Sequence, residues 1–410
     1  MRLKLNLILL LFSTLTSAQK LSEEQRKFIN DASALIDSDS NFENSKWDLL
    51  LEKVKDKRIV SIGEFNHGSR EVFDLRYSLI QKLHKKLGFD VILFESGLGE
   101  LIAPNLQKDH LNSRHITSRL MGPWITREFD LLMQYVKAEN LEIAGFDVQR
   151  TGKGFEEALS VFLLKNLENT DRFLNLENRY GKAASLLRNR KTTYDDIKGE
   201  VSALRSDYND LYNILGNGTE NSKEAKLIRK TLMNRIAFLD YMLQFKSDGD
   251  WSKRWAARDT QMYENINWLL KNIYPGKKVI IVAHNFHISK FNQVELVMGE
   301  LLKDEFKDEI YAIGVFAGSG VSADNFRREE TLSPPDSDRL DIKHIIQSLS
   351  GFAHYLPVPE QAYSGSEWLF EDIIVNDTFI NLYKKNTMNL SKKFDALILL
   401  QKVSLPEYRF

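Results

Sequence analysis

Acidic and imidazole side chains recur at four places in the sequence, each directly after a short apolar stretch. In chain order they are Glu64, His67, Glu95, Asp147, His284 and His287. A histidine beside a carboxylate is a common pair for general base catalysis, because the carboxylate orients an imidazole that takes up a proton. Polar residues also mark the places where strands end, but this set holds three of the eight histidines of the chain. The pattern favours one shared site.

Six short apolar segments are predicted as strands, at 58–62, 90–94, 141–146, 278–283, 309–316 and 394–400. They are rich in β-branched residues or continuously apolar, which is typical of strands covered on both faces. Helical patterns separate several of them, so the sequence predicts an α/β fold with a mostly parallel central sheet flanked by helices. The carboxyl ends of parallel strands meet at one edge of the sheet, where ligands bind. The acidic and imidazole residues are therefore expected in one cleft.

The stretch 155–245 shows no strand pattern. Two apolar stripes at helical spacing lie on either side of the turn signal Asn217-Gly218, which predicts an antiparallel helical hairpin inserted in the core. A packed cap and a lid over the site are both compatible with this pattern. We expect a further helical region at 21–54 and a long loop region at 318–363. The predicted division is 1–18, 19–154 (first part of the core), 155–250 (helical insertion) and 251–410 (second part of the core).

The N-terminus resembles a secretory signal peptide. Arg2 and Lys4 precede an apolar run at 5–15, and small residues lead to a predicted cleavage site after Ala18. The apolar run is too short to span a bilayer, and a retained anchor is the alternative. We expect a periplasmic or secreted protein without a membrane anchor after cleavage.

Charge and cysteine content exclude several classes of function. The chain has 56 basic and 57 acidic residues, and removal of residues 1–18 leaves 54 basic residues and a net charge of −3. This balance counts against nucleic acid as a partner. The chain has no cysteine, which excludes disulfides, thiol catalysis and cysteine-ligated zinc or iron–sulfur sites.

Two predicted helices place charged residues on apolar faces. Arg76 lies at the centre of the apolar face of the helix expected to begin near Ser69. Burial of that guanidinium requires an anion, for which Glu64 and Glu95 are the nearest candidates, unless the side chain extends past the edge of the face. Arg258 and the residue after it lie near the apolar centre of a later helix, and each is expected to reach a partner elsewhere.

His67 is the best candidate for a general base. It lies near a helix N-terminus, whose partial positive charge disfavours imidazolium, while Glu64 or Glu95 acts in the opposite direction. The pair His284-x-x-His287 is a weak metal signature, and we predict no metal and no cofactor. Phosphate-binding loops, dinucleotide fingerprints and a Gly-x-Ser-x-Gly elbow do not occur, so a serine nucleophile is unsupported. Ser69 is interpreted as a helix cap.

These motifs together resemble the erythromycin esterase family. The resemblance rests on Gly63-Glu64-x-x-His67-Gly68, the downstream Arg76, Phe94-Glu95, Arg258-Asp259-x-x-Met262-x-x-Asn265, Ala283-His284-Asn285-x-His287 and the final strand at 394–397. It covers most of the chain, from about 58 to 400, and implies an α/β core with a helical insertion.

The resemblance implies a hydrolase that acts on an ester or lactone, as the family's esterases inactivate macrolide antibiotics. By that analogy His67 activates water, Glu64 or Glu95 orients His67 or the water, and Arg76 holds the carboxylates. His284 or His287 would assist the oxyanion or the leaving alkoxide, and no acyl-enzyme would form. The remaining candidates, for substrate binding, are Asn66, Asp147, Arg258 and Asn285. The alternative is an exported protein of the same fold group that binds haem or another ligand through the cleft histidines.

Overall fold

The computed structural model describes residues 21–37, 47–166, 171–216, 221–380 and 386–409. The predicted signal peptide and the Asn217-Gly218 turn lie outside these ranges. The strands are β1 (Ala34–Ile36), β2 (Ile59–Ile62), β3 (Phe89–Gly97), β4 (Glu142–Asp147), β5 (Lys278–Val282), β6 (Ile310–Ala317), β7 (Val321–Ala323), β8 (Glu329–Thr331), β9 (Ala353–Pro357), β10 (Asp372–Ile374), β11 (Thr387–Asn389) and β12 (Ala396–Leu400). All six predicted strands are confirmed.

One sheet organises the molecule. In the part of the chain that the structure describes, its strand order is β1-β9-β12-β6-β2-β5-β3-β4. The six strands from β12 to β4 run parallel, and β9 and β1 extend the sheet antiparallel at one edge. The predicted α/β class with a mostly parallel sheet is therefore confirmed.

Continuous apolar runs form these strands because both faces of the sheet are covered. Within β3, Val91 and Leu93 belong to one hydrophobic core while Ile92 and Phe94 belong to the other. The same alternation holds in β5. Side chains of successive strand residues point to opposite faces, so a strand between two cores needs apolar residues at every position.

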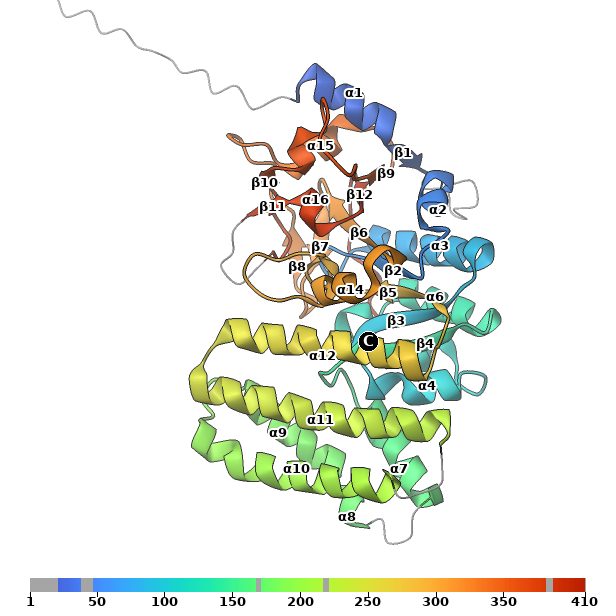
Figure 1. Ribbon diagram of the computed structural model, residues 1–410, viewed down its shortest axis with the longest axis vertical. Coiled ribbons are helices and arrows are strands. Elements are labelled where there is room, and N and C mark those ends of the chain that lie inside the picture. Colours follow the sequence, from blue (N-terminus) through green and yellow to red (C-terminus); the bar gives the residue numbers. More distant parts are fainter. Residues whose placement is uncertain (1–20, 38–46, 167–170, 217–220, 381–385, 410) are drawn as a thin grey trace, which may run out of the picture.

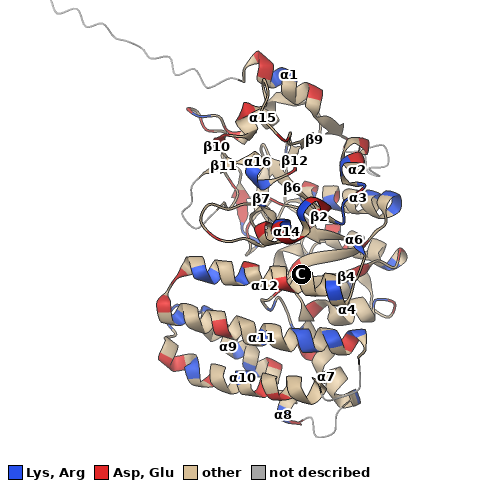
Figure 2. Cartoon of the chain, in the orientation of Figure 1, with Lys and Arg blue, Asp and Glu red and all other residues tan. Residues whose placement is uncertain are grey.

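Helices cover both faces. They are α1 (Glu23–Ala32), α2 (Asp48–Val54), α3 (Arg70–Leu87), α4 (Ile102–Leu106), α5 (Ser113–Thr117), α6 (Arg127–Ala138), α7 (Gly154–Asn166), α8 (Asp171–Leu174), α9 (Leu176–Arg188), α10 (Tyr194–Gly216), α11 (Lys223–Asp248), α12 (Trp251–Asn272), α13 (Asn285–Ile288), α14 (Met298–Phe306), α15 (Ile342–Ser348) and α16 (Leu390–Lys393). Helices α2, α3 and α6 contribute to one core, and α12, α14 and α15 contribute to the other. None of the helices described here is both long and apolar enough to cross a bilayer. Charges of both signs are interspersed over the elements (Figure 2).

The predicted hairpin corresponds to α10 and α11, which pack along each other. Figure 1 shows these two helices and α9 stacked beyond α12, at one end of the molecule. Helix α9 joins the hairpin by packing on both of its helices, so the insertion is larger than two helices. The domain boundaries at 154 and 250 stay predictions.

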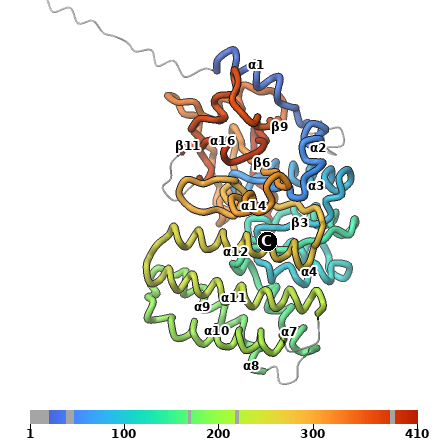
Figure 3. Tube along the Cα trace, in the orientation of Figure 1, coloured from blue at the N-terminus to red at the C-terminus, as the bar shows by residue number. Residues whose placement is uncertain are grey.

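Two expectations were wrong. The segment 21–54 is not wholly helical, because β1 lies within it and pairs with β9. The early and late parts of the chain therefore lie side by side (Figure 3). The segment 318–363 is not a long loop, since it contains β7, β8, α15 and β9. Strands of three to five residues carry too short a pattern to be recognised among serine, glycine and proline.

The connections that follow β2 and β5 create a crevice in which a ligand site can form. The chain leaves β2 through α3 towards β3, and it leaves the neighbouring β5 through α13 and α14 towards β6 on the other side. Helix α3 packs in one core and α14 in the other, so these connections run over opposite faces of the sheet and a crevice forms beyond the carboxyl ends of β2 and β5. The segments that hold His67 and His284 follow these two strands directly.

Candidate active site

The loop between β2 and α3 lies directly against the segment after β5. A Cβ atom on Gly63 would collide with the Asn285 side chain, so only glycine permits this approach. The Asn285 backbone N–H donates to the Glu64 carbonyl at 2.8 Å. The close contact brings the two histidine-bearing segments together, and the rings of His67 and His284 lie 5.1 Å apart between centroids.

Glu64 and His67 form a directed pair. Glu64 is fully buried, and its Oε1 lies 2.6 Å from His67 Nδ1. Trp124 Nε1 donates to the same oxygen at 3.2 Å. A carboxylate at this distance places the proton of the neutral imidazole on Nδ1, which leaves the lone pair on Nε2. His67 Nε2 has no hydrogen-bond partner among the described residues.

Arg76 fixes this pair to the sheet. Its Nη1 donates to Glu64 Oε2 at 2.6 Å, and its Nη2 donates to the carbonyls of Ile62 at 3.3 Å and Ala283 at 2.9 Å. The guanidinium is 1% exposed, as the apolar face of its helix predicts. It therefore compensates the buried carboxylate and ties the ends of β2 and β5 together. Its direct carboxylate partner is Glu64, whereas Glu95 acts only through its charge.

A second group surrounds the end of β3. Arg258 of α12 donates from Nη2 to Glu95 Oε1 at 2.9 Å and to Asp147 Oδ2 at 2.6 Å. Glu95 Oε2 accepts the backbone N–H of His284 at 2.9 Å. Burial raises the pKa of Glu95, but His287 and Arg258 outweigh burial and hold that pKa well below its usual range. Glu95 is thus an anion that joins α12, β3 and the segment after β5.

His287 is a cation in this group. Its Nδ1 lies 2.8 Å from Asp259 Oδ1, and its Nε2 lies 3.2 Å from Glu95 Oε1. Burial lowers the pKa of His287, but these two carboxylates outweigh burial and raise it to about 9. Arg258 Nη1 lies 3.0 Å from His287 Nε2. Both atoms are donors when the imidazole is protonated, so we interpret this approach as packing around the shared acceptor Glu95.

His284, by contrast, is uncharged. Its Nδ1 accepts the Phe286 backbone N–H at 3.1 Å, so the ring proton lies on Nε2 and donates to the Phe65 carbonyl at 2.9 Å. Burial, together with the neighbouring His67, lowers the pKa of His284 to about 3. The ring is therefore a neutral imidazole with both nitrogens engaged.

A cavity of about 850 Å³ opens in front of these groups. Of the predicted site residues, those that line it are Asn66, His67, Glu95, Asp147, Arg258, His284 and His287. Glu64 and Arg76 lie behind His67 and are not part of the lining. Asn285 is also outside it, because its side-chain amide bonds Val315 of β6 in both directions, at 2.8 and 3.0 Å. The predicted residues thus meet at one place, with Asn285 in a positioning role.

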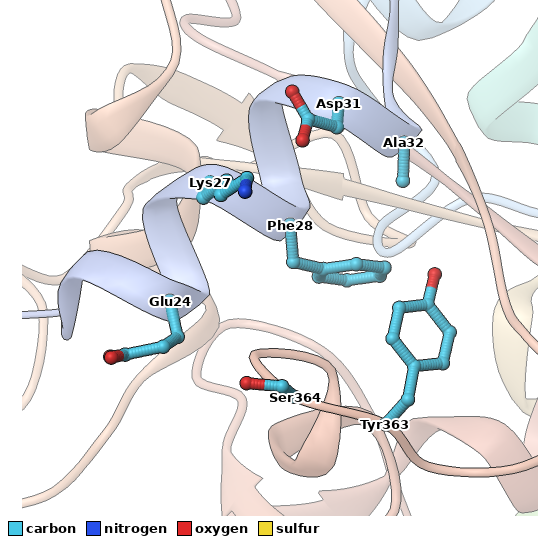
Figure 4. Close-up of a pocket in the computed structure, with 7 residues that line it drawn as sticks. All are labelled: Glu24, Lys27, Phe28, Asp31, Ala32, Tyr363 and Ser364. Carbon is cyan, nitrogen blue, oxygen red and sulfur yellow. The ribbon is translucent and has the colours of Figure 1, made fainter.

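Another cavity, of about 400 Å³, lies far from this chemistry in the fold. It is formed between α1 and the loop at Tyr363, and Figure 4 shows the seven residues that line it. None of them is a histidine or arginine, and the aromatic rings of Phe28 and Tyr363 meet edge to face there. It offers the carboxylates of Glu24 and Asp31 but no imidazole, and it shares no lining residue with the cavity that holds His67.

The predicted cap is only partly correct. Ser69 occupies the N-cap position of α3, but its hydroxyl makes no capping bond and is buried without a partner. Ser96 Oγ accepts the Met121 backbone N–H at 2.9 Å. Neither hydroxyl is hydrogen-bonded to a histidine among the described residues, which agrees with the absence of a serine nucleophile motif.

Sequence reasoning missed several residues of the site. Trp124 comes from a 3₁₀ turn with no strand pattern near it. Asp259 was recognised as a charged residue on an apolar face, but its partner His287 was not. The aromatic lining, Trp255, Phe286 and Phe379, gives no sequence signal, because aromatic residues in a helix or loop are more often part of the core.

No group of three or more histidine, aspartate and glutamate side chains within the described ranges is arranged to hold a metal ion. The carboxylates and cations of the site instead pair with one another, while Arg76 Nε and Asp259 Oδ2 are buried without a hydrogen-bond partner in the described part of the chain.

Comparison with known proteins identifies the family of this chain. The erythromycin esterase family model matches residues 84–403. The chain is 26% identical to the putative hydrolase YbfO of Bacillus subtilis (98% of this chain, 97% of the relative) and 24% identical to erythromycin esterase type II of Escherichia coli (90% and 94%). A solved Bacillus cereus protein shares the fold, with a TM-score of 0.75 at 19% identity over 94% of this chain and 99% of that one. The chain belongs to the erythromycin esterase family.

Proposed function

We propose that this protein is an exported hydrolase that cleaves an ester or lactone by attack of a water molecule activated by His67. Membership of the erythromycin esterase family and the likeness to a putative hydrolase support hydrolysis of a small molecule. The observation that carries the proposal is a single geometry: His67 is bonded at Nδ1 to a buried carboxylate, while its Nε2 has no partner among the described residues and the residue lines a large cavity.

Each group around His67 serves the proposed proton transfer. Glu64 keeps the proton of the resting ring on Nδ1 and stabilises the imidazolium that forms during turnover. Arg76 and Trp124 donate to Glu64 and hold its position. The carboxylate therefore needs no rearrangement when the charge on His67 changes.

The reaction has two steps. The water oxygen attacks the carbonyl carbon while His67 Nε2 takes a water proton, which gives a tetrahedral oxyanion and an imidazolium. The carbon–oxygen bond to the leaving alkoxide then breaks, and His67 returns the proton to that oxygen. The products are a carboxylic acid and an alcohol, or one hydroxy acid if the substrate is a lactone. No covalent bond to the protein forms.

The two later histidines differ in their fitness to stabilise the oxyanion. His284 is neutral and donates its proton to the Phe65 carbonyl. His287 is a cation that lines the same cavity, beside Arg258. Both N–H groups of His287 already face Asp259 and Glu95, so it would act on the developing oxyanion through its positive charge, and we assign this role to His287 on that ground.

The test is a hydrolysis screen of esters and lactones, macrolides included, on the chain without residues 1–18. Hydrolysis by the wild-type protein with loss in the His67→Ala variant supports the proposal. Hydrolysis that survives His67→Ala rejects His67 as the base. The absence of any ester or lactone hydrolysis rejects the reaction class.

Metal independence is tested separately. Prolonged dialysis against a chelator, followed by assay on a substrate from the screen, is expected to leave turnover unchanged. Complete loss that added zinc restores would reject the metal-free mechanism.

Export is tested on protein made in a host with a secretory pathway. We expect the mature chain outside the cytoplasm with Gln19 as its first residue, as intact mass and N-terminal sequencing report. A chain that keeps Arg2 and Lys4 would contradict cleavage.

The ligand-binding alternative has less support. A haem ligand needs an imidazole nitrogen without a competing bond. Both nitrogens of His284 and of His287 lie within bonding distance of protein atoms. The remaining ring, His67, keeps Nε2 without a partner among the described residues, and we assign that nitrogen to proton transfer because family membership and the likeness to a putative hydrolase favour hydrolysis.

A further inference from the structure

We propose that Arg188 and Arg254 form an anion-binding subsite in the cavity that holds His67, and that the substrate is an ester or lactone with a second, negatively charged group. The inference rests on the proposed hydrolase function, which it extends to a class of substrate. The group that these arginines would take is a carboxylate, sulfate or phosphate monoester, away from the bond that is cleaved.

Four arginines line the cavity: Arg150, Arg188, Arg254 and Arg258. Two of them are neutralised within the protein. Arg258 pairs with Glu95 and Asp147, and Arg150 pairs with Glu156 at 3.2 Å.

The other two arginines have no carboxylate partner among the residues that the structure describes. Arg188 is the last residue of α9, and its polar side-chain contact is a long one of 3.4 Å to Gln149. Arg254 lies in the first turns of α12 and makes no side-chain hydrogen bond within the described ranges. The acidic residues nearest to it along the chain, Asp248 and Asp250, pair with Lys253 instead. Two positive charges therefore stay uncompensated at one wall.

Aromatic rings stack against the guanidiniums of both arginines. The Arg188 guanidinium lies 5.0 Å from the ring centroid of Phe238. That of Arg254 lies 5.1 Å from Phe245 and 4.8 Å from Trp251. Stacking fixes the plane of a guanidinium and leaves the N–H groups at its edge for an oxyanion.

The two charges are close enough to affect each other. Burial lowers the pKa of Arg254, and the neighbouring guanidiniums of Arg188 and Arg258 lower it further. Like charges held together without a counterion are unfavourable, and an anion bound between them relieves the repulsion.

The rest of the cavity complements such a ligand. Trp255, Phe286 and Phe379 form an aromatic cluster in its lining, with ring centroids 4.9 to 6.0 Å apart. Acidic residues lie at another part of the lining, where Asp324 pairs with Arg328 and Asp377 pairs with Lys343. An apolar body with one anionic end therefore fits the cavity better than a cationic substrate.

The experiment compares matched esters on the mature chain. The anionic probes are mono-p-nitrophenyl esters of dicarboxylic acids of increasing length, and the neutral probes are their methyl esters. We expect the wild-type ratio of kcat/KM, anionic over neutral, to exceed 10 at low salt and to fall with added salt. In Arg188→Gln/Arg254→Gln this ratio should fall at least 10-fold, mainly through KM for the anionic ester.

Arg190→Gln is the matched control, because it removes an exposed arginine of the same segment that does not line the cavity. The ratio should not change in this variant. A ratio that stays constant in the double variant, or a preference for neutral esters in the wild type, would overturn the subsite.

A binding experiment tests the anion subsite independently of the proposed hydrolysis. Adipate, inorganic sulfate and inorganic phosphate are titrated against the mature wild-type chain by calorimetry, so the result does not depend on turnover. Saturable binding of at least one of them that the double variant loses and Arg190→Gln keeps supports the subsite, even if no ester is hydrolysed. Equal binding to all three chains, or binding to none, rejects it. The three anions also distinguish a carboxylate from a sulfate or phosphate subsite.

Discussion

Arg76 and Arg235 are the fully buried arginines of the described residues, and their two surroundings differ in what else they contain besides carboxylates. At the edge of the sheet, Arg76 pairs with Glu64, which also accepts from His67 and Trp124. In the helical region, Arg235 of α11 pairs with Glu177 of α9 and with Glu100, which follows β3. Both guanidiniums are 1% exposed.

The helical network is closed. Arg235 lies between the rings of Phe155 and Tyr180, at 5.0 and 4.7 Å from their centroids. Tyr208 donates to Glu177 Oε1 at 2.7 Å. None of these residues lines the cavity that holds His67. The network joins α9 and α11 to the end of β3, and its chemistry has no access to a ligand.

The difference teaches how to recognise a site among buried charges. Burial and perturbed pKa values occur in both places, since burial and Glu177 raise the pKa of Glu100 more than Arg235 lowers it. Only the network at the sheet edge ends in a side chain, His67, that has one nitrogen without a partner among the described residues and that lines a cavity. An open end of a buried network, rather than the burial itself, indicates catalysis.

The largest loss of activity is expected from replacing His67, the side chain at the open end of the network. His67→Ala should lower turnover by about 10²–10⁴-fold, because it removes the base while the rest of the network stays. His67→Asn should show the same loss, since its amide still donates to Glu64 but does not accept a proton from water.

The free energy of unfolding of both variants should lie within about 1 kcal/mol of the wild-type value, as chemical denaturation measures. Full activity of either on a confirmed substrate would remove the distinction between the two networks.

Replacement of Arg76 and replacement of Arg235 should lower the stability of the fold equally but should differ in their effect on activity. Arg76→Met and Arg235→Met each leave buried carboxylates without their cation and should cost about 3–5 kcal/mol of unfolding free energy. Only Arg76→Met should also lower kcat per folded molecule, because Glu64 then loses its position beside His67. Urea denaturation and activity corrected for the folded fraction measure the two effects.

Arg190→Met, an exposed arginine, is the control and should change stability by less than about 0.5 kcal/mol. If Arg76→Met left the denaturation midpoint unchanged, its buried pairing with Glu64 would be wrong.

The sheet edge was predictable for a physical reason. Strands between two cores are apolar throughout, so six of them are visible in the sequence, and the residues after them must meet at one edge. This reasoning predicts that Glu64, His67, Glu95 and His284 lie together, as they do in the structure. Arg76 was found because a charge on an apolar helical face needs an anion.

The rest depends on packing that one sequence does not specify. Helix α12 lies against β4, and this contact brings Asp259 to His287 and Arg258 to Asp147. Strand β1 has three residues, and β9 lies between serine, glycine and proline residues that favour turns, so neither shows a strand pattern. Arg188 and Arg254 occupy ordinary polar positions of their helices, and only the cavity shows that their charges are uncompensated.

The two histidines after β5 give opposite dependences of stability on pH. The pKa of His287 is raised to about 9 from 6.5. The stabilisation from its charged form is complete below pH 6.5 and is lost as the pH rises through 9. The full difference is about 3 kcal/mol. Denaturation between pH 6 and 10 should show this loss in the wild type and a smaller one in His287→Gln.

His284 is the internal control. Its pKa is lowered to about 3, so its neutral form stabilises the fold above pH 6.5, and that contribution falls as the pH decreases towards 3. His284→Gln should therefore change the acid side of the profile and leave the alkaline side unaltered. Identical alkaline profiles of the wild type and His287→Gln would show that His287 is neutral in the folded protein.

The smallest effects give the sharpest comparison, because one hydrogen bond is removed from each network. Trp124→Phe removes the donor at 3.2 Å from Glu64 but keeps a ring against Phe129. Tyr208→Phe removes the donor at 2.7 Å from Glu177. A bond of this kind to a carboxylate contributes about 1.5–3 kcal/mol.

We expect that contribution to appear in different measurements. Trp124→Phe should lower kcat by about 3–10-fold, since Glu64 holds the imidazolium of His67 less well in the transition state. Tyr208→Phe should lower the free energy of unfolding by about 1.5–3 kcal/mol and leave kcat within about twofold. A loss of kcat in Tyr208→Phe would mean that the helical network, although closed to ligands, transmits its geometry through Glu100 to the end of β3. The helical region would then be part of the catalytic apparatus, and the contrast between an open and a closed network would no longer hold.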